Sequence, residues 1–249
     1  KTDEMECSAL IRKLPKFYVY YMAKMQQFYL DVLGLSKAKL RFRELSDEER
    51  AFYNKYHYDV ELQLGIGWKE IAGLHYRTDH DLGGHEKISH HDMSVSIDGK
   101  KFLPHVIELS FGVDRNIFAL LDLCYREEKE RALFSFPRLL SPFDCSIFPL
   151  VNKDNLPDKA VEIKNMLKNS GFAVFYDDSG SIGRRYRRMD EIGVALCITI
   201  DHRTLGDDTL TLRDRDSMKQ VRVGIKNLDQ SIRRFLQGEN IERLGEIVK

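Results

Sequence analysis

A strand-to-helix junction at residues 106–122, VIELSFGVDRNIFALLD, constrains the fold of this chain more than any other stretch. A short apolar strand carries Glu108 and Ser110, and Gly112 then provides a turn. Arg115 lies in the first turn of a helix whose apolar residues recur at helical spacing. The sequence thus brings a carboxylate, a hydroxyl and a guanidinium to the point where a buried strand meets a helix N-terminus. Such a junction can bind a cationic group and an anionic group side by side.

The residues before this junction predict a mixture of helices and strands. We expect a helix at 17–33 and strands at 40–43, 60–64 and 68–74. Ser46 and Glu49 have the spacing of a capping box, which predicts the start of another helix. Residues 78–100 are polar and rich in His, Asp and Gly, so we expect a long loop or excursion there.

A proline-rich connection marks a domain boundary. Three prolines between residues 135 and 149 predict a rigid link. Beyond it, strands are expected at 145–150, 172–176, 195–200, 210–213 and 220–223, and helices at 160–168, at 184–190 and from 228 onward. This alternation is typical of a small α/β domain of about 110 residues. We therefore predict two domains, at residues 1–139 and 140–249.

Composition argues against several classes of protein. The chain has 249 residues and a formal net charge of zero, so no global basic field points to nucleic acid. Its four cysteines form no CxxC pair, which favours reduced thiols in a cytoplasmic protein. No apolar run approaches the ~20 residues of a membrane span. The first ten residues also lack the features of a targeting peptide.

Two glutamates lie on strands that we expect in the core. Glu70 and Glu108 both have apolar neighbours in the sequence. A buried carboxylate costs roughly several kcal/mol unless it is paired. Glu70 could instead face solvent. Together the two carboxylates could hold an ammonium group, whose three N–H donors need several acceptors.

Arg115 follows the strand directly and admits two interpretations. It could be an ordinary surface residue at the start of a helix. The helix dipole, however, disfavours a cation at that end. A bound phosphate would remove the conflict, because the guanidinium and the helix N-terminus would contact the same anion.

Clusters of histidine and arginine are the remaining candidates. Five histidines between residues 75 and 91 fit no zinc spacing, so we predict no metal site. The second domain carries a set of arginines that could contact phosphate or single-stranded RNA. These are Arg184, Arg185, Arg187, Arg188, Arg213 and Arg215. The alternatives are a solvated helix for the first four and a self-neutralised turn for the last two.

Four stretches together resemble a known family. They are GWKEIAGLHYRTDHDL at 67–82, VIELSFGVDR at 106–115, DDSGSIGRRYRRMDEIGVALCITID at 177–201 and TLRDRDSMKQVRV at 211–223. Over essentially its whole length the chain resembles the C-terminal part of the homodimeric class II glycyl-tRNA synthetases. The resemblance implies an α/β (α+β) chain. Residues 1–139 would be the end of an antiparallel-sheet catalytic domain, and 140–249 would be an anticodon-binding domain.

The resemblance also implies roles for the candidate residues. Glu70, Glu108 and Ser110 would line the pocket for the glycine ammonium group, and Arg115 would be the motif 3 arginine that contacts ATP. The reaction would be attack of the glycine carboxylate on the α-phosphate of ATP, accompanied by Mg2+. Glycine would then be transferred to tRNA(Gly). The full-length enzyme would be a homodimer with no membrane contact.

The sequence also departs from the family pattern. Leu109 replaces the usual proline of motif 3. RFRE at 41–44 superficially matches the motif 2 arginine, but we reject the match because a helix-like segment, not a second strand, is expected after it. Motifs 1 and 2 would then lie upstream of Lys1. A non-catalytic nucleic-acid-binding relative and one half of a split synthetase remain alternatives.

Overall fold

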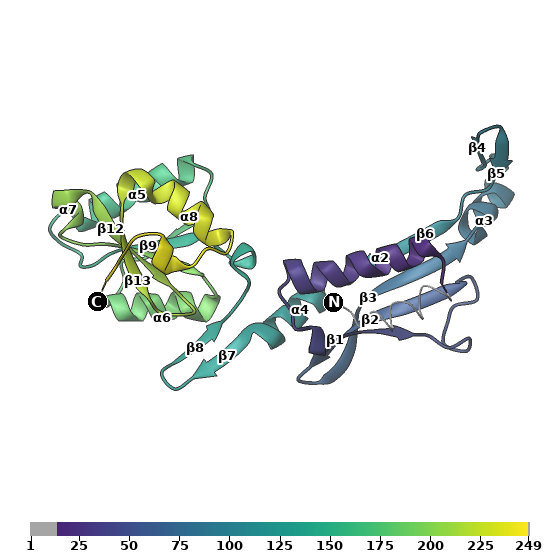
Figure 1. Ribbon diagram of the computed structural model, residues 1–249, viewed down its shortest axis with the longest axis horizontal. Helices are drawn as coiled ribbons and strands as arrows, with labels where there is room; N and C mark the ends of the chain where they lie inside the picture. Colours follow the sequence, from purple (N-terminus) through teal and green to yellow (C-terminus); the bar gives the residue numbers. More distant parts are fainter. Residues whose placement is uncertain (1–13, 249) are drawn as a thin grey trace. The chain divides into compact units, whose positions relative to one another are not determined.

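The computed structural model describes residues 14–248, and its internal contacts divide the chain after Leu123 into two compact units (Figure 1). Cys7 and the other residues of the N-terminal stretch considered for targeting lie outside the described residues. The remaining cysteines, Cys124, Cys145 and Cys197, are buried free thiols. No helix in the described part is long and apolar enough to cross a membrane.

The first unit contains a four-stranded antiparallel sheet in the order β1-β2-β3-β6. Its strands are β1 (Leu40–Glu44), β2 (Tyr56–Leu64), β3 (Gly67–Thr78) and β6 (Val106–Phe111). Its helices are α2 (Lys16–Gln27), the π-helical η1 (Phe28–Val32), the 3-10 turn η2 (Lys37–Lys39) and α4 (Val113–Cys124). The strands expected at 40–43, 60–64 and 68–74 and the helix at 17–33 are confirmed.

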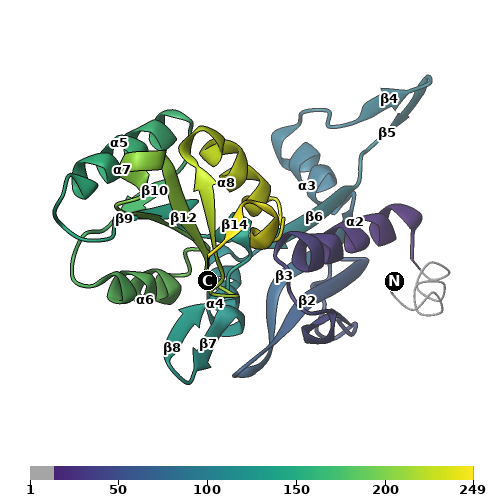
Figure 2. The ribbon, with the colours of Figure 1, turned by 60° about the vertical axis from the view of Figure 1, so that its left-hand side comes forward.

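One face of this sheet is apolar and is covered by α2 (Figures 1 and 2). Tyr18, Met22 and Met25 are buried on that helix at spacings of three and four residues. Tyr18 also donates a hydrogen bond of 2.6 Å from its hydroxyl to the carbonyl oxygen of Leu74 in β3. Because successive strand residues point to opposite faces, burial of this face leaves the polar residues of the same strands together on the other.

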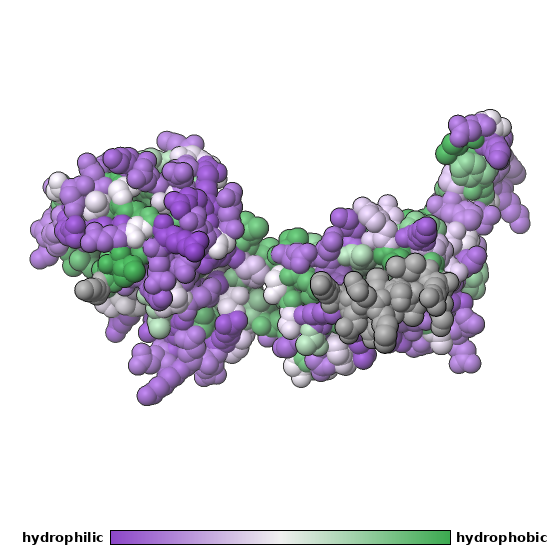
Figure 3. Space-filling model, in the orientation of Figure 1, coloured by the Kyte–Doolittle hydropathy of each residue, from purple (hydrophilic) through white to green (hydrophobic). Residues whose placement is uncertain are grey.

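The loop or excursion expected at residues 78–100 is an excursion with regular elements. It contains α3 (His80–Ser89) and the strands β4 (Val95–Ile97) and β5 (Lys100–Phe102), which form a hairpin. The apolar side chains of Val95, Ile97 and Phe102 remain exposed, and Figure 3 shows apolar surface on this part of the chain. The helix and the two strands were not predicted because they bury almost nothing, so the sequence lacks the apolar period that indicates a helix or a strand.

The capping box gives a different result from the one expected. The backbone N–H of Ser46 and the side chain of Glu49 form a hydrogen bond of 3.1 Å, and the reciprocal bond measures 3.3 Å. Residues 47–50 nevertheless form only turns, not a helix. The chain then enters β2, which pairs with β1. The reason given for rejecting RFRE as motif 2 was therefore wrong, because a second strand does lie beside it.

The second unit is an α/β domain with the sheet order β10-β9-β11-β12-β13-β14. These strands are β9 (Cys145–Pro149), β10 (Val174–Tyr176), β11 (Leu196–Ile200), β12 (Thr209–Asp214), β13 (Gln220–Gly224) and β14 (Glu246–Ile247). β9 runs parallel to β10 and β11, and the other pairs are antiparallel. The expected alternation of strand and helix is confirmed.

Helices cover both faces of this second sheet (Figure 1). They are α5 (Leu156–Asn169), α6 (Ile182–Ile192), the short α7 (Thr204–Asp207) and α8 (Leu228–Leu236), with 3-10 turns at η3 (Arg138–Leu140), η4 (Ile225–Asn227) and η5 (Ile241–Arg243). α5 and α8 share one core with Ile147 and Ile198, and α6 packs on the opposite face against Phe148 and Cys197. Ile147 faces one core and Phe148 faces the other, so both sides of β9 are buried and its sequence is almost continuously apolar.

A hairpin missed in the sequence begins this second unit. It consists of β7 (Tyr125–Glu128) and β8 (Arg131–Phe134). By contacts, residues 124–139 therefore group with the second unit. The assignment of 1–139 and 140–249 as functional domains stays a prediction.

Candidate functional site

The exposed face of the first sheet carries a continuous set of polar side chains. The cross-strand register aligns Arg43 with Asp59, Asp59 with Gly73, and Gly73 with Ser110. The neighbouring row aligns His57 with His75 and His75 with Glu108. Because these positions alternate with buried ones, four strands deliver charged and hydrogen-bonding groups to one surface.

A β-bulge adds Glu70 to this surface. The register of β2 and β3 shifts between Val60 and Glu61, so that Val60 pairs with Ala72 and Glu61 with Glu70. Ile71 is the additional residue and is buried. Bulges redirect side chains in this way. Glu70 therefore faces the same side as Glu61, and its carboxylate is half-exposed rather than buried.

Ion pairs organise the carboxylates of this face. Arg77 contacts Glu108 at 2.5 Å and Asp81 at 2.8 Å. Arg43 contacts Asp59 at 2.9 Å and Glu61 at 3.1 Å. The Glu108 carboxylate is still 37% exposed, so it retains acceptor capacity for a ligand.

Gly73 lets the side chains of His75 and Ser110 pack closely over the backbone of β3. A Cβ at this position would lie 3.1 Å from Ser110 Oγ and 2.5 Å from His75 Nε2. Any side chain would therefore displace these neighbours. Ser110 and Glu108 are two residues apart on β6 and face the same side, so their oxygen atoms could together accept from a small cationic group.

Two neighbouring histidines, whose ring planes are inclined at 40°, lie next to Gly73. The rings of His57 and His75 are 3.9 Å apart between centroids. Burial, reinforced by His75, lowers the pKa of His57 to about 4. Burial likewise lowers the pKa of His75, although Glu108 acts in the opposite direction. Both rings are thus neutral at pH 7 and add no positive charge to the surface.

Arg115 and Glu70 form a second locus at the start of α4. Arg115 Nη1 lies 2.9 Å from Glu70 Oε2, and the two side chains are 60% and 48% exposed. They line a cavity of about 540 Å³ together with Ile66, Lys69 and Phe118. The guanidinium is thus held by one carboxylate and remains open to an anionic ligand.

The predicted glycine residues lie on two strands of the same sheet face. Glu108 and Ser110 lie together on β6, beside Gly73. Glu70 lies further along β3 and contacts Arg115, and its carboxylate also acts electrostatically on His57, Asp59 and His75 next to them. The assignment of Glu70 to the glycine pocket stays a prediction.

The arginines of α6 differ in accessibility. Arg184 is exposed, and Arg187 and Arg188 have side chains 36% and 40% exposed. Arg185 is buried and donates hydrogen bonds to the carbonyl oxygens of Asp178 and Gly180, at 2.8 and 2.7 Å. The guanidinium of Arg185 therefore stabilises the turn before α6 and is not available to RNA.

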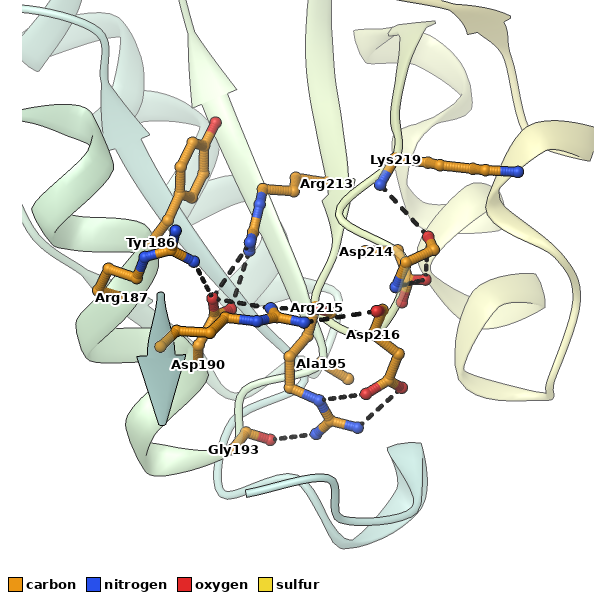
Figure 4. Close-up of polar contacts among 12 residues, drawn as sticks. Tyr186, Arg187, Asp190, Gly193, Ala195, Arg213, Asp214, Arg215, Asp216 and Lys219 are labelled. Carbon is orange, nitrogen blue, oxygen red and sulfur yellow. Dashed lines mark hydrogen bonds and ion pairs between the residues drawn. The ribbon is translucent and has the colours of Figure 1, made fainter. Parts of the chain in front are cut away.

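Arg213 and Arg215 are also largely buried, and their contact with RNA stays a prediction. Asp190 is fully buried and accepts hydrogen bonds from Arg213 at 2.9 and 3.1 Å and from Arg131 of the β7–β8 hairpin at 3.0 Å (Figure 4). Arg215 donates to the carbonyl oxygen of Gly193 at 2.9 Å and pairs with Asp216. Buried guanidiniums with all these partners have a structural role.

A groove of about 700 Å³ lies beside the accessible arginines. It is lined by Arg184, Arg187 and Arg188 of α6, and by Met218 and Gln220 at the β12–β13 turn. The ring of Tyr186 also borders it and stacks against the guanidinium of Arg213 at 4.7 Å. A positively charged groove with an aromatic ring and polar edges can hold an unstacked nucleobase and its phosphates.

Sequence reasoning missed several groups of the first site. Asp59, Glu61 and Arg77 escaped notice, although strict alternation along 57–61 and 73–77 was a usable signal. Among residues 14–248 no cluster of His, Cys, Asp and Glu is arranged to hold a metal ion.

Comparisons with known proteins agree with this geometry. Residues 144–234 match the family model of the anticodon binding domain. Prolyl-tRNA synthetase from Cryptosporidium parvum, solved with L-proline and AMP, has a TM-score of 0.65 and 18% identity, covering 92% of this chain and 48% of that one. The fold is therefore similar to that of a class II tRNA synthetase, and the second unit contains the match to the anticodon binding domain.

The sequence relatives are more specific. Glycine–tRNA ligase of Clostridium tetani is 45% identical over 208 residues, covering 80% of this chain and 44% of the relative. The enzymes of Borrelia hermsii and Aeropyrum pernix are 36% and 34% identical and cover 93% and 92% of this chain. The chain is thus a homologue of the glycine–tRNA ligases and spans about half the length of these relatives.

Proposed function

We propose that this chain is the part of a glycine–tRNA ligase that binds the glycine ammonium group, contacts ATP and recognises the anticodon of tRNA(Gly). The reaction is attack of the glycine carboxylate on the α-phosphate of ATP, followed by transfer of glycine to the 3′ end of the tRNA. The observation that carries the proposal is the placement of Ser110 and Glu108 on one side of β6, beside a glycine at position 73 where no side chain fits, on a sheet face rich in carboxylates.

These residues suit glycine in both size and charge. The ammonium group would donate to Glu108 and Ser110, which lie two residues apart on the same strand and therefore on the same face. An amino acid with a side chain would need additional space near Gly73, where even a Cβ meets two neighbours. Steric exclusion of this kind is effective when the correct substrate is the smallest one.

The Arg115 locus suits the nucleotide. We propose that the ATP phosphates approach the guanidinium of Arg115 and the N-terminus of α4, with Mg2+ carried as part of the nucleotide substrate. Glu70 would orient Arg115 through the 2.9 Å contact between them, and its carboxylate would also add negative charge to the glycine pocket. Such catalysis depends on positioning and on stabilisation of developing charge, not on a protein nucleophile.

Activity also requires the part of the enzyme that this chain does not contain. Val113, Ile117 and Leu121, spaced one helical turn apart on α4, are 69%, 52% and 41% exposed. β6 is also the last strand of its sheet. An apolar helix face and a free sheet edge support packing against a further polypeptide. We propose that the complete enzyme includes this polypeptide, is a homodimer and acts in the cytoplasm.

The α6 groove is the proposed tRNA surface. Arg184, Arg187 and Arg188 would contact phosphates, and Tyr186 would offer an aromatic contact to a base. Arg185, Arg213 and Arg215 are left out of this surface because their guanidinium groups are buried.

Pyrophosphate exchange into ATP tests the catalytic part of the proposal. The isolated chain is expected to show no glycine-dependent exchange. Combined with the polypeptide that corresponds to the remainder of the relatives, it should gain exchange that depends on glycine and is lost in the Glu108→Gln variant. Exchange by the isolated chain would contradict the proposed division of the site. Exchange that is unaffected by Glu108→Gln would contradict the assignment of the ammonium pocket.

A further inference from the structure

We propose that His75 is a positioning residue, fixed by Asn54 as the neutral tautomer with its proton on Nε2, and that it orients the Ser110 hydroxyl toward the substrate ammonium group. This inference rests on the proposed glycine site, in which Ser110 is an acceptor. It assigns a role to His75, which the sequence did not single out. It also explains how the imidazole next to the pocket stays uncharged.

The hydrogen bonds around His75 define the tautomer. Asn54 Nδ2 lies 3.2 Å from His75 Nδ1. An amide nitrogen only donates, so Nδ1 must be the acceptor and cannot carry a proton. The ring proton of the neutral imidazole is then on Nε2, which lies 3.3 Å from Ser110 Oγ. His75 therefore donates to Ser110, and not the reverse.

The same bonds define the orientation of Ser110. The hydroxyl of Ser110 can donate its own proton to the carbonyl oxygen of Gly73, at 3.4 Å. One lone pair of Oγ accepts from His75, which leaves the second lone pair for an external donor. Gly73 has no side chain to cover this oxygen, since a Cβ there would lie only 3.1 Å from it. An ammonium N–H is a suitable donor for it.

The groups that face His75 come from every neighbouring element. His57 and Asp59 lie on β2, Glu108 and Ser110 on β6, and Asn54 on the segment before β2. Arg77 and Glu70 act from β3 itself. Burial is the largest influence and favours the neutral ring.

Neutrality of His75 matters for the ligand. A protonated ring would present an Nδ1–H to the Asn54 amide, where it would meet another donor instead of an acceptor. It would also place a cation next to the proposed ammonium site and reduce the effect of Glu108. The arrangement thus excludes the charged form of His75 and protects recognition of a cationic substrate.

Nuclear magnetic resonance of the imidazole rings tests the inference directly in the 249-residue chain. Long-range proton–nitrogen correlation spectra distinguish a protonated ring nitrogen from an unprotonated one, and His75→Gln assigns the signals. We expect His75 to show protonated Nε2 and unprotonated Nδ1 throughout pH 6–8. A wild-type spectrum with the proton on Nδ1 would overturn the inference without the need for any further variant.

The substitution Asn54→Asp provides the second arm. A carboxylate would accept a proton from Nδ1, so the tautomer should switch or the ring should become charged, with its titration midpoint raised by about 1–3 pH units. Asn165→Asp, which adds the same charge on the exposed face of α5, should leave His75 unchanged. An unchanged tautomer and midpoint in folded Asn54→Asp would overturn the inference.

These outcomes are separable from failure of the proposed function. The tautomer is observed without glycine, ATP or tRNA, so a chain that proves not to be a glycine–tRNA ligase can still show it. Conversely, a correct tautomer combined with glycine-dependent exchange that is unaffected by Glu108→Gln would reject the ammonium pocket and leave the His75 arrangement intact.

Discussion

Substitution of Gly73 by Ala tests the close packing of His75 and Ser110 over this position of β3. Gly73 lies in β3 with an ordinary backbone conformation, so alanine introduces no backbone strain there. Its Cβ, however, would lie 2.5 Å from His75 Nε2 and 3.1 Å from Ser110 Oγ. The His75 ring must rotate away, which breaks its hydrogen bonds to Asn54 and Ser110.

The expected loss of stability follows from these contacts. Each lost hydrogen bond contributes about 0.5–1.5 kcal/mol, and overpacking costs about 1–3 kcal/mol in comparable cases. Because the relocated ring regains water on its exposed side, we expect Gly73→Ala to lower the free energy of unfolding of the first unit by about 1–3 kcal/mol. Glycine binding should also weaken at least about tenfold, which corresponds to 1.4 kcal/mol.

The assay uses the single tryptophan of the chain. Trp68 lies on β3, so its fluorescence during urea unfolding reports on the first unit. Gly84→Ala is the matched control, because a Cβ on that glycine in α3 meets no atom within 4 Å. Alanine there should stabilise by about 0.5–1 kcal/mol through helix propensity. If Gly73→Ala proved as stable as Gly84→Ala and retained glycine binding, the claim that a side chain at position 73 displaces His75 and Ser110 would be refuted.

Three further predictions concern charge. Lowering the pH from 6.5 to 4 should reduce the free energy of unfolding of the first unit by up to about 3 kcal/mol. The reason is that His57 in the unfolded state binds a proton in this range, whereas the folded His57, with its pKa of about 4, does not. His57→Gln should therefore flatten this part of the pH profile in the Trp68 assay. Asp190→Asn should destabilise the second unit by about 3–5 kcal/mol in calorimetric unfolding, since it leaves Arg131 and Arg213 without a buried counter-ion. The control Asp208→Asn, at an exposed position, should change the stability little. Arg184→Ala should weaken tRNA binding without a change in melting temperature, because its side chain is exposed. Arg185→Ala should lower the melting temperature, because Arg185 donates hydrogen bonds to backbone carbonyl groups. The reverse pattern would contradict the proposed surface.

The sequence predicted the elements whose side chains are strongly partitioned between core and solvent. α2, β2, β3 and the strands of the second unit have buried faces, so their apolar periods are clear. The segment 78–100 was misjudged because α3 and the β4–β5 hairpin project few side chains into a core. Weak burial removes the pattern on which such predictions depend.

The candidate site was only partly predictable for a different reason. Glu108, Ser110 and Arg115 are close in sequence and were found together. The position of Glu70 depends on a β-bulge between β2 and β3, and the inward direction of Arg213 depends on its pairing with Asp190, 23 residues away. Neither the bulge nor the long-range ion pair leaves a local signal. Residues of the same type, such as Arg184 and Arg185, could therefore not be separated without the fold.

Binding of tRNA by the isolated chain tests the central claim most directly. Transcripts of tRNA(Gly) with its native anticodon and with a substituted anticodon, otherwise identical, would be compared by filter binding at fixed salt, because phosphate contacts alone depend strongly on ionic strength. The account predicts tighter binding of the native transcript, with the difference lost in the triple substitution of Arg184, Arg187 and Arg188 by alanine. Equal affinity for both transcripts at every salt concentration would contradict it and would instead indicate a nucleic-acid-binding relative without synthetase specificity.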